Sequence, residues 1–133
     1  MFRMPFSRRN VPLSGTPSVR RLKIYSAESG YVYQYFYEGY RSMRSGAESG
    51  IEFVFRISAD RKRWQPVSVF VADFILSGWE NANERELSAT ERYAVAKMAL
   101  FHAFDEGATP AQIKTEVRLG AADAKAILNT LDL

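Results

Sequence analysis

Tyr93 and Lys97 form the clearest candidate for acid–base chemistry in the sequence. Residues four positions apart share one face of a helix, and an ammonium group beside a phenol favours the phenolate. An oxidoreductase that used such a pair on a nucleotide would also need a glycine-rich phosphate-binding turn, and the sequence has none. We therefore interpret Tyr93 as a packing residue of a helix, with Lys97 at the rim of the core.

Metal and nucleophile chemistry lacks the residues that it needs. The chain has no cysteine and one histidine, His102, which excludes disulfides, thiolate chemistry and cysteine-ligated metals. One histidine does not supply metal-ligand spacing, and we interpret His102 as a helix-end residue placed favourably in the helix dipole. The sequence thus predicts no catalytic residue, no metal site and no cofactor, and it favours a binding protein over an enzyme.

The carboxylates leave one enzymatic alternative open. They are scattered over predicted loops, at Asp60, Asp73, Glu80, Glu84 and Glu86. Two carboxylates from different loops can still converge in space and act as an acid–base pair. A small enzyme with a carboxylate-based site at a dimer interface is therefore an alternative function.

Positive charge is concentrated at the N-terminus. The chain has 18 basic and 15 acidic residues and a pI of about 9.3. Six of the basic residues and none of the acidic ones lie in positions 1–27, so the remainder is net negative. Residues 1–19 also hold three prolines and a glycine without clear periodicity, which predicts a flexible basic arm. Such an arm can bind nucleic acid.

The rest of the chain is long enough for one folded domain. With 133 residues and 47% hydrophobic composition, we expect a single domain over residues 20–133. The arginine pair at positions 8 and 9 is not followed by the apolar run of an export signal. No stretch of about 18 apolar residues exists. We therefore predict a cytoplasmic protein without a membrane partner.

Residues 21–72 carry the pattern of an antiparallel sheet. Leu22 and Ile24 alternate with polar residues, and Tyr31–Tyr40 is rich in aromatic side chains, which suit a pleated surface. The segments Ile51–Ser58 and Val67–Ala72 alternate between apolar and polar positions. Short connections favour antiparallel neighbours, so the pattern predicts a meander of three or four strands.

Residues 73–133 are predicted to be helical. Ser88 and Glu91 fit a capping box that begins a helix ending near Glu106. Further helices are expected from Thr109 to about Gly120 and over about 122–131, with a helical turn and a loop over 73–87. The predicted fold class is α+β, an antiparallel sheet followed by three C-terminal helices packed on one face.

The strand at 31–40 has two aromatic faces. Tyr31, Tyr33, Tyr35 and Tyr37 share one face, whereas Phe36 and Tyr40 share the opposite one. If the opposite face met the helices, Gln34 and Glu38 would be buried, at a cost of several kcal/mol unless they were paired. We therefore favour the tyrosines facing the helices. Either way, aromatic side chains are left on the face away from the helices.

An exposed aromatic surface of this kind usually marks an interface. We therefore predict a non-enzymatic interaction domain that self-associates through the sheet, with a homodimer favoured. The alternative is single-stranded nucleic-acid binding, in which aromatic side chains stack on bases and basic residues follow the backbone. The helix pair predicted over 109–131 carries too little positive charge to favour DNA binding. The residues assigned to the interface are Tyr31, Tyr33, Phe36, Tyr40, Arg56 and Phe70.

Overall fold

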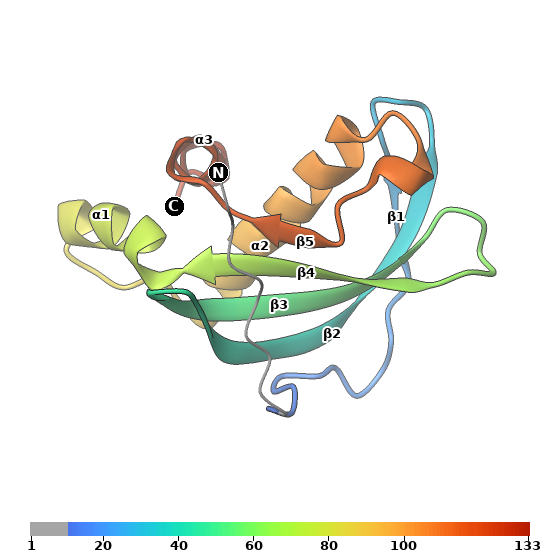
Figure 1. The fold of residues 1–133 in the computed structure, drawn as a ribbon. Helices are drawn as coiled ribbons and strands as arrows, with labels where there is room; N and C mark the ends of the chain where they lie inside the picture. The colour runs from blue at the N-terminus through green and yellow to red at the C-terminus, as the bar shows by residue number, and fades with distance from the viewer. Residues whose placement is uncertain (1–10) are drawn as a thin grey trace.

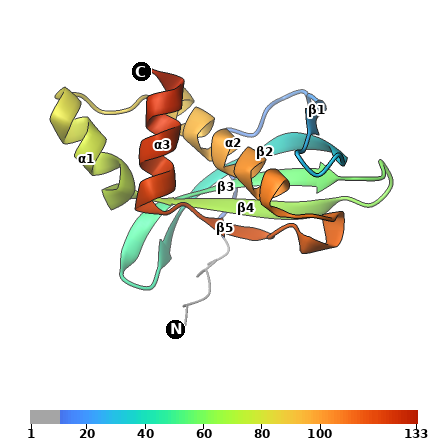
Figure 2. The same ribbon diagram turned by 90° about the horizontal axis from the view of Figure 1, so that it is seen from above.

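The protein is an α+β fold in which helices lie over one face of a five-stranded sheet (Figures 1 and 2). A computed structural model describes residues 11–133. The elements, in chain order, are β1 (Lys23–Ser26), β2 (Val32–Ser45), β3 (Glu48–Ser58), β4 (Gln65–Ala72), α1 (Asp73–Asn83), α2 (Ala89–Glu106), the short 3₁₀ turn η1 (Pro110–Gln112), β5 (Glu116–Arg118) and α3 (Ala121–Leu131).

The sheet is mixed and has five strands, whereas the sequence predicted three or four. Its order is β1-β2-β3-β4-β5, and the first four strands are antiparallel neighbours. The fifth strand, β5, runs parallel to β4. It comes from the segment expected to form a helix after Thr109. Pro110 begins only the single turn η1 there. The next residues include the β-branched Thr115, a residue type that favours strands. This segment pairs with β4, where Ser68 N–H donates to Thr115 O.

The helices cover one face of the sheet, but one of them was not expected. Helix α1 occupies residues for which the sequence predicted only a turn and a loop. Helix α2 begins as predicted, with a complete capping box: Ser88 Oγ accepts from Glu91 N–H at 3.1 Å, and Glu91 Oε1 accepts from Ser88 N–H at 2.8 Å. The predicted α+β class is thus confirmed, whereas a simple meander with three helices after it is wrong in detail.

Three of the tyrosines in β2 face the helices, as predicted. Tyr33 is 1% exposed and stacks on Phe104 of α2, with ring centroids 4.5 Å apart. Tyr35 is 3% exposed, and Tyr37 packs against the same core. Each ring covers apolar area, but the Tyr33 hydroxyl is buried and has no hydrogen-bond partner among the described residues. The inner face of the sheet is therefore a layer of aromatic and aliphatic side chains.

A β-bulge in β2 changes which side chains face the helices. The register shifts between Tyr37 and Gly39, so that Tyr40 pairs with Phe53 on the inner face. Gly39 has φ of +132°, and a Cβ there would lie 2.6 Å from Ser14 O. Only glycine adopts this backbone conformation without strain. The prediction that Tyr40 shares a face with Phe36 is consequently wrong, because simple alternation does not continue through a bulge.

Residues just before β1 lie along the edge of β2 (Figure 1). Ser14 N–H donates to Tyr40 O at 2.7 Å, and Tyr40 N–H donates to Ser14 O at 2.9 Å. Thr16 Oγ1 donates to Glu38 O at 2.6 Å. The arm predicted over 1–19 therefore includes residues bonded to the sheet, and its first ten residues lie outside the described part of the chain.

Candidate anion-binding pocket

Three of the six predicted interface residues lie on the outer face of the sheet, away from the helices. Phe36 and Arg56 are cross-strand partners, and Phe70 lies on β4, on the same face. Phe36 is 6% exposed and Phe70 is 0% exposed. The Arg56 guanidinium is 3.1 Å from a carboxylate oxygen of Glu38. The structure thus places these three on one face, but largely buried or paired.

The other three predicted residues lie elsewhere. Tyr33 is in the core between the sheet and α2. Tyr40 is on the inner face beyond the bulge and is 37% exposed. Tyr31 precedes β2 and is 43% exposed. The six residues therefore do not form one continuous surface.

A pocket forms where the chain before β1 bends away from the edge of β2. Ser14 pairs with Tyr40, and Lys23 pairs with Tyr35. Between these two pairs, the segment before β1 has eight residues (15–22), whereas β2 has four (36–39). The longer segment therefore bends outward. The hollow has a volume of about 440 Å³ and is lined by Gly15, Pro17, Ser18, Val19, Arg21, Lys23, Tyr35, Phe36, Tyr37 and Tyr93.

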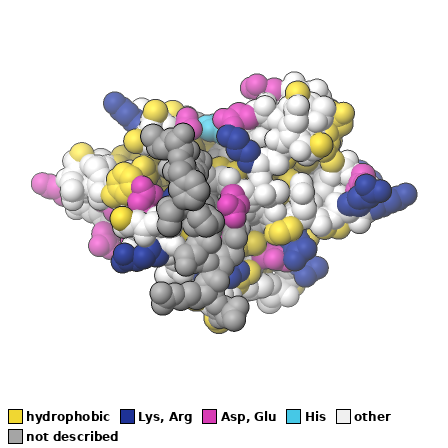
Figure 3. Space-filling view, viewed as in Figure 1, with side chains coloured by type: hydrophobic (Ala, Val, Ile, Leu, Met, Phe, Trp, Pro, Cys, Tyr) yellow, Lys and Arg dark blue, Asp and Glu magenta, His cyan; other side chains and the backbone are white. Residues whose placement is uncertain are grey.

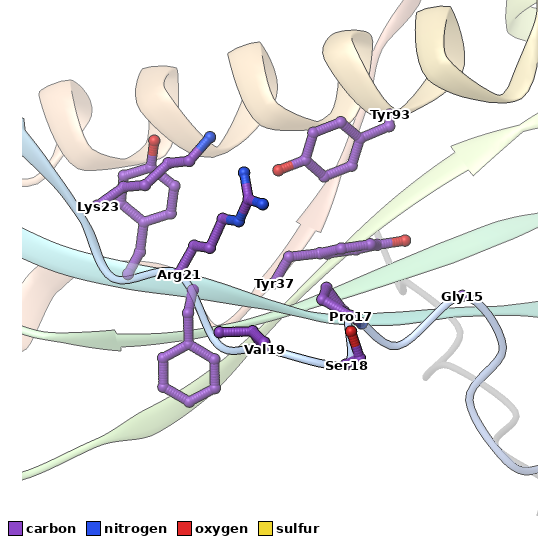
Figure 4. A pocket seen from close by; sticks show the side chains of 10 residues that line it. Gly15, Pro17, Ser18, Val19, Arg21, Lys23, Tyr37 and Tyr93 are labelled. Carbon is purple, nitrogen blue, oxygen red and sulfur yellow. The ribbon is translucent and has the colours of Figure 1, made fainter.

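Two cations line this pocket and a third lies beside it. Figure 4 shows the Arg21 guanidinium, the Lys23 ammonium and the Tyr93 hydroxyl pointing into the same space beneath α2. From α2, Lys97 Nζ lies 5.9 Å from the centre of the Tyr35 ring. Burial lowers the pKa of Lys97, and the adjacent ammonium of Lys23 lowers it further.

No carboxylate lines the pocket among the residues that the structure describes. Asp105, about two turns further along α2, accepts hydrogen bonds from the Tyr25 hydroxyl at 2.6 Å and from Glu28 N–H at 3.0 Å. The Asp105 carboxylate is thus bonded to Tyr25 and Glu28, and it does not line the pocket that holds Arg21. Cations that converge without an acidic partner repel one another, and an anion placed between them relieves that repulsion.

The phenols of the pocket are hydrogen-bond donors. Burial raises the pKa of both Tyr37 and Tyr93, and their rings meet edge to face with centroids 4.7 Å apart. Tyr93 is therefore a neutral phenol at neutral pH, not the phenolate that a catalytic Tyr-x-x-x-Lys pair needs. A neutral O–H can donate to an anion, so the same side chain suits binding.

The sequence carried the signals for this site, but in separate places. Tyr93 and Lys97 have the spacing of a helical pair, which by itself indicates packing, while Arg21 and Lys23 belong to the basic N-terminal stretch. The alternation of Arg21, Lys23 and Tyr25 on the tyrosine-bearing side of the sheet is the pattern that joins them. What it could not reveal is the outward bend of residues 15–22.

Other chemistry has less support within residues 11–133. No group of three His, Cys, Asp or Glu side chains there is arranged to hold a metal ion. His102 lines a smaller hollow of about 150 Å³ between α2 and β5, together with Glu106, Lys114 and Asp123. No described helix combines the length and the hydrophobicity needed to cross a membrane. The pocket beneath α2 is therefore the stronger candidate site.

Comparisons of this chain with protein-family models, with curated proteins and with solved structures found no match. Functional inference accordingly starts from the geometry of the described residues.

Proposed function

We propose that this protein is a non-enzymatic binding domain whose pocket beneath α2 receives an anionic ligand. The observation that carries the proposal is that Arg21 and Lys23 line a pocket together with tyrosines and no described carboxylate, while Lys97 lies beside it. Elsewhere on the sheet, arginines are held by glutamates, as in the pair of Arg41 with Glu52. Arginines that support the sheet lie beside glutamates. The cations of the pocket have no acidic side chain among its described lining residues.

The pocket favours a small ligand with an anionic group and a planar body. Its volume of about 440 Å³ lies within the range of small-molecule sites, which hold a few precisely placed polar groups on apolar walls. The Arg21 guanidinium can bind a carboxylate or phosphate through two parallel hydrogen bonds. The rings of Tyr35 and Tyr37 offer flat surfaces against which an aromatic body can stack.

Calorimetric titration of the full chain with benzoate, inorganic phosphate and adenosine monophosphate tests this proposal. At least one of these anions should bind, and Arg21→Gln should weaken it by about tenfold or more, as expected for loss of a charge-assisted hydrogen bond. Arg44→Gln, which removes an exposed arginine from the far end of β2, is the matched control and should leave the affinity unchanged. Absence of binding, or equal loss in both variants, would overturn the proposal.

Single-stranded nucleic acid is tested in the same titration. On the face of the molecule in Figure 3, basic side chains lie apart from one another with acidic ones between them. At the β3–β4 hairpin, Asp60 accepts hydrogen bonds from the backbone N–H groups of Lys62 and Arg63. Such an arrangement weakens the field that a nucleic-acid strand would follow. An oligonucleotide that bound more tightly than the mononucleotide, with steep salt dependence, would replace the small-ligand proposal.

Self-association is the second candidate, and exposed apolar residues at the β1 edge support it. Leu22, Ile24 and Val32 are 56%, 60% and 49% exposed. Ile24 and Val32 lie on the outer face, and β1 is an edge strand. Exposed apolar side chains on an edge strand favour pairing with another copy. We therefore place the proposed dimer contact here and not on the six residues that the sequence singled out.

Light scattering on a size-exclusion column tests the dimer. Wild-type protein should elute with the mass of two chains, and Ile24→Lys should elute as a monomer because it places a charge in the apolar contact. Phe74→Lys, at a residue 57% exposed on α1, is the control and should stay dimeric. A monomeric wild-type protein at high concentration would exclude this second candidate.

A further inference from the structure

Among the five lysines in the chain, Lys97 differs from the others in its burial and in its aromatic neighbours. It projects from α2 over the sheet, and its Nζ lies 5.9 Å from the centre of the Tyr35 ring and 5.8 Å from that of Phe101. It is partly buried, whereas Lys62, Lys114 and Lys125 are exposed. An amine held between aromatic rings at the edge of a cavity is shielded from water on several sides.

A second amine of the site lies near Lys97. Lys23 comes from β1, and Figure 4 shows it directed toward α2. Two ammonium groups near each other disfavour each other's charge, and Lys23 is one of the causes that lower the pKa of Lys97. Burial acts in the same direction on Lys97 and lowers its pKa. A neutral amine is a nucleophile, whereas an ammonium is not.

We propose that Lys97 captures the carbonyl group of a small anionic aldehyde or α-keto acid as a reversible imine, with the acid group of the ligand held by Arg21. The inference rests on the proposed anion-binding function and narrows its ligand class. It needs a nucleophile, an anion-binding group and an apolar enclosure around both. Arg21 and the aromatic walls line the pocket beneath α2, and Lys97 lies beside it, with its Nζ 5.9 Å from the centre of the Tyr35 ring that forms one wall.

The reaction is a condensation that needs no oxidant and no further reactant. The nitrogen lone pair of Lys97 forms a bond to the carbonyl carbon; the nitrogen loses one proton and the carbonyl oxygen takes one up, which gives a carbinolamine. The carbon–oxygen bond then breaks as the carbon–nitrogen double bond forms. The nitrogen loses its second proton, and the oxygen takes up another and leaves as water. The neutral phenol of Tyr93 lines the same pocket and is a group that can donate a proton to the departing oxygen. Hydrolysis reverses every step, so capture is a form of binding.

The competing interpretation is that Lys97 is a structural cation stacked on two aromatic rings. Cation–π contacts of this kind contribute about 0.5–2 kcal/mol to stability. The two interpretations differ in a measurable property. A stacked ammonium reacts with carbonyl compounds no faster than any exposed lysine, whereas an amine with a depressed pKa and a bound anionic partner reacts faster.

Reductive trapping with glyoxylate and cyanoborohydride distinguishes them. The reagent reduces an imine to a stable secondary amine, so peptide mass spectrometry on the full chain can assign carboxymethyl groups to individual lysines. Lys97 should be modified faster than Lys125, since a lowered pKa raises the fraction of the amine that is neutral and reactive. Lys23→Met should slow the reaction at Lys97, while the control Lys62→Met should not. Modification that simply follows exposure, or that begins at Lys23, would overturn the proposal.

A comparison of glyoxylate with the neutral aldehyde propanal tests the reactivity of Lys97 separately from anion binding in the pocket. If Lys97 is reactive but the pocket does not bind anions, propanal and glyoxylate will modify it equally, and phosphate will not compete. If the pocket binds anions but Lys97 is unreactive, phosphate or benzoate will bind in the calorimeter while glyoxylate shows no preference for Lys97. Agreement of both proposals requires faster reaction with glyoxylate than with propanal and inhibition of the glyoxylate reaction alone by phosphate.

Discussion

The basic side chains on the two faces of the sheet differ in whether they have acidic partners. On the outer face, three arginines each lie within ion-pair distance of a glutamate. These pairs are Arg41–Glu52 at 3.2 Å, Arg56–Glu38 at 3.1 Å and Arg118–Glu48 at 3.5 Å. At the inner edge, Arg21 and Lys23 line the pocket and Lys97 lies over the Tyr35 ring, with no carboxylate among the described lining residues.

This difference separates charges that support the fold from charges available to a ligand. A buried or half-buried cation needs a compensating anion, because removal from water is costly. The outer face supplies that anion from its own strands. The pocket beneath α2 does not, and its lining cations Arg21 and Lys23 are exposed to solvent, where a ligand can replace water. The comparison therefore predicts opposite consequences for mutations on the two sides.

Removing an aromatic ring from the inner layer should have the largest effect. Phe104 is fully buried and stacks on both Tyr33 and Tyr25. Phe104→Ala should lower the free energy of unfolding by about 3–5 kcal/mol, through lost burial and the cavity left behind. Phe74→Ala, at an exposed position, should change it by less than about 0.5 kcal/mol. Urea denaturation followed by circular dichroism measures both, and similar losses would show that the core has been misplaced.

Removing a carboxylate from the outer face should have the next largest effect. Glu52 is fully buried, and its carboxylate oxygen lies 3.2 Å from Arg41 Nε. Glu52→Ala should cost about 3 kcal/mol, because it leaves a partly buried guanidinium without its partner. The control is Glu86→Ala in the exposed loop before α2, for which urea denaturation should show almost no change. If the two variants unfold alike, the outer pairs do not support the fold.

Alkaline pH should weaken the inner face selectively. Burial raises the pKa of Tyr35 to about 12, whereas a tyrosine in the unfolded chain ionises near pH 10. Above pH of about 10 the unfolded state releases a proton that the folded state retains, so the stabilisation is complete below that pH and declines as pH approaches 12. For this tyrosine the free energy of unfolding should fall by about 1.4 kcal/mol per pH unit over that interval.

Tyr35→Phe checks the alkaline prediction. The variant has no phenol to ionise at this position, so its free energy of unfolding should fall less steeply with pH than that of wild type. Tyr31→Phe, at an exposed position outside the sheet, serves as the control and should follow the wild-type curve. Equal slopes in all three proteins would mean that Tyr35 titrates as a solvated residue.

The sequence predicts best where one local interaction decides the outcome. The capping box of Ser88 and Glu91 marks the start of α2 correctly. The inward orientation of Tyr33 and Tyr35 follows from the cost of burying the alternative face of β2. Both predictions depend on residues within a few positions of one another, or on a comparison between the two faces of one strand.

Prediction from the sequence fails where contacts with a distant segment of the chain determine the local structure. The segment before β5 has a helix-start pattern at Thr109 and Pro110, but pairing with β4 draws the following residues into the sheet. The bulge before Gly39 reverses the face of Tyr40, and it accompanies the contact of Tyr40 with the distant residue Ser14. The candidate pocket depends on the same distant contact, so its residues could be recognised from the sequence but not assembled.

The smallest expected change is in the stability of Arg21→Gln, and it sharpens the comparison most. Arg21 lies beside Lys23 in a pocket without a described acidic lining residue, so its removal relieves repulsion and breaks no ion pair. The free energy of unfolding should change by less than about 0.5 kcal/mol, with an increase favoured at low salt, where charges are least screened. Arg41→Gln should instead be destabilising, because Glu52 is fully buried beside it. A loss above about 1 kcal/mol for Arg21→Gln would mean that this guanidinium supports the fold as the outer arginines do, and the distinction between structural and ligand-binding cations would no longer hold.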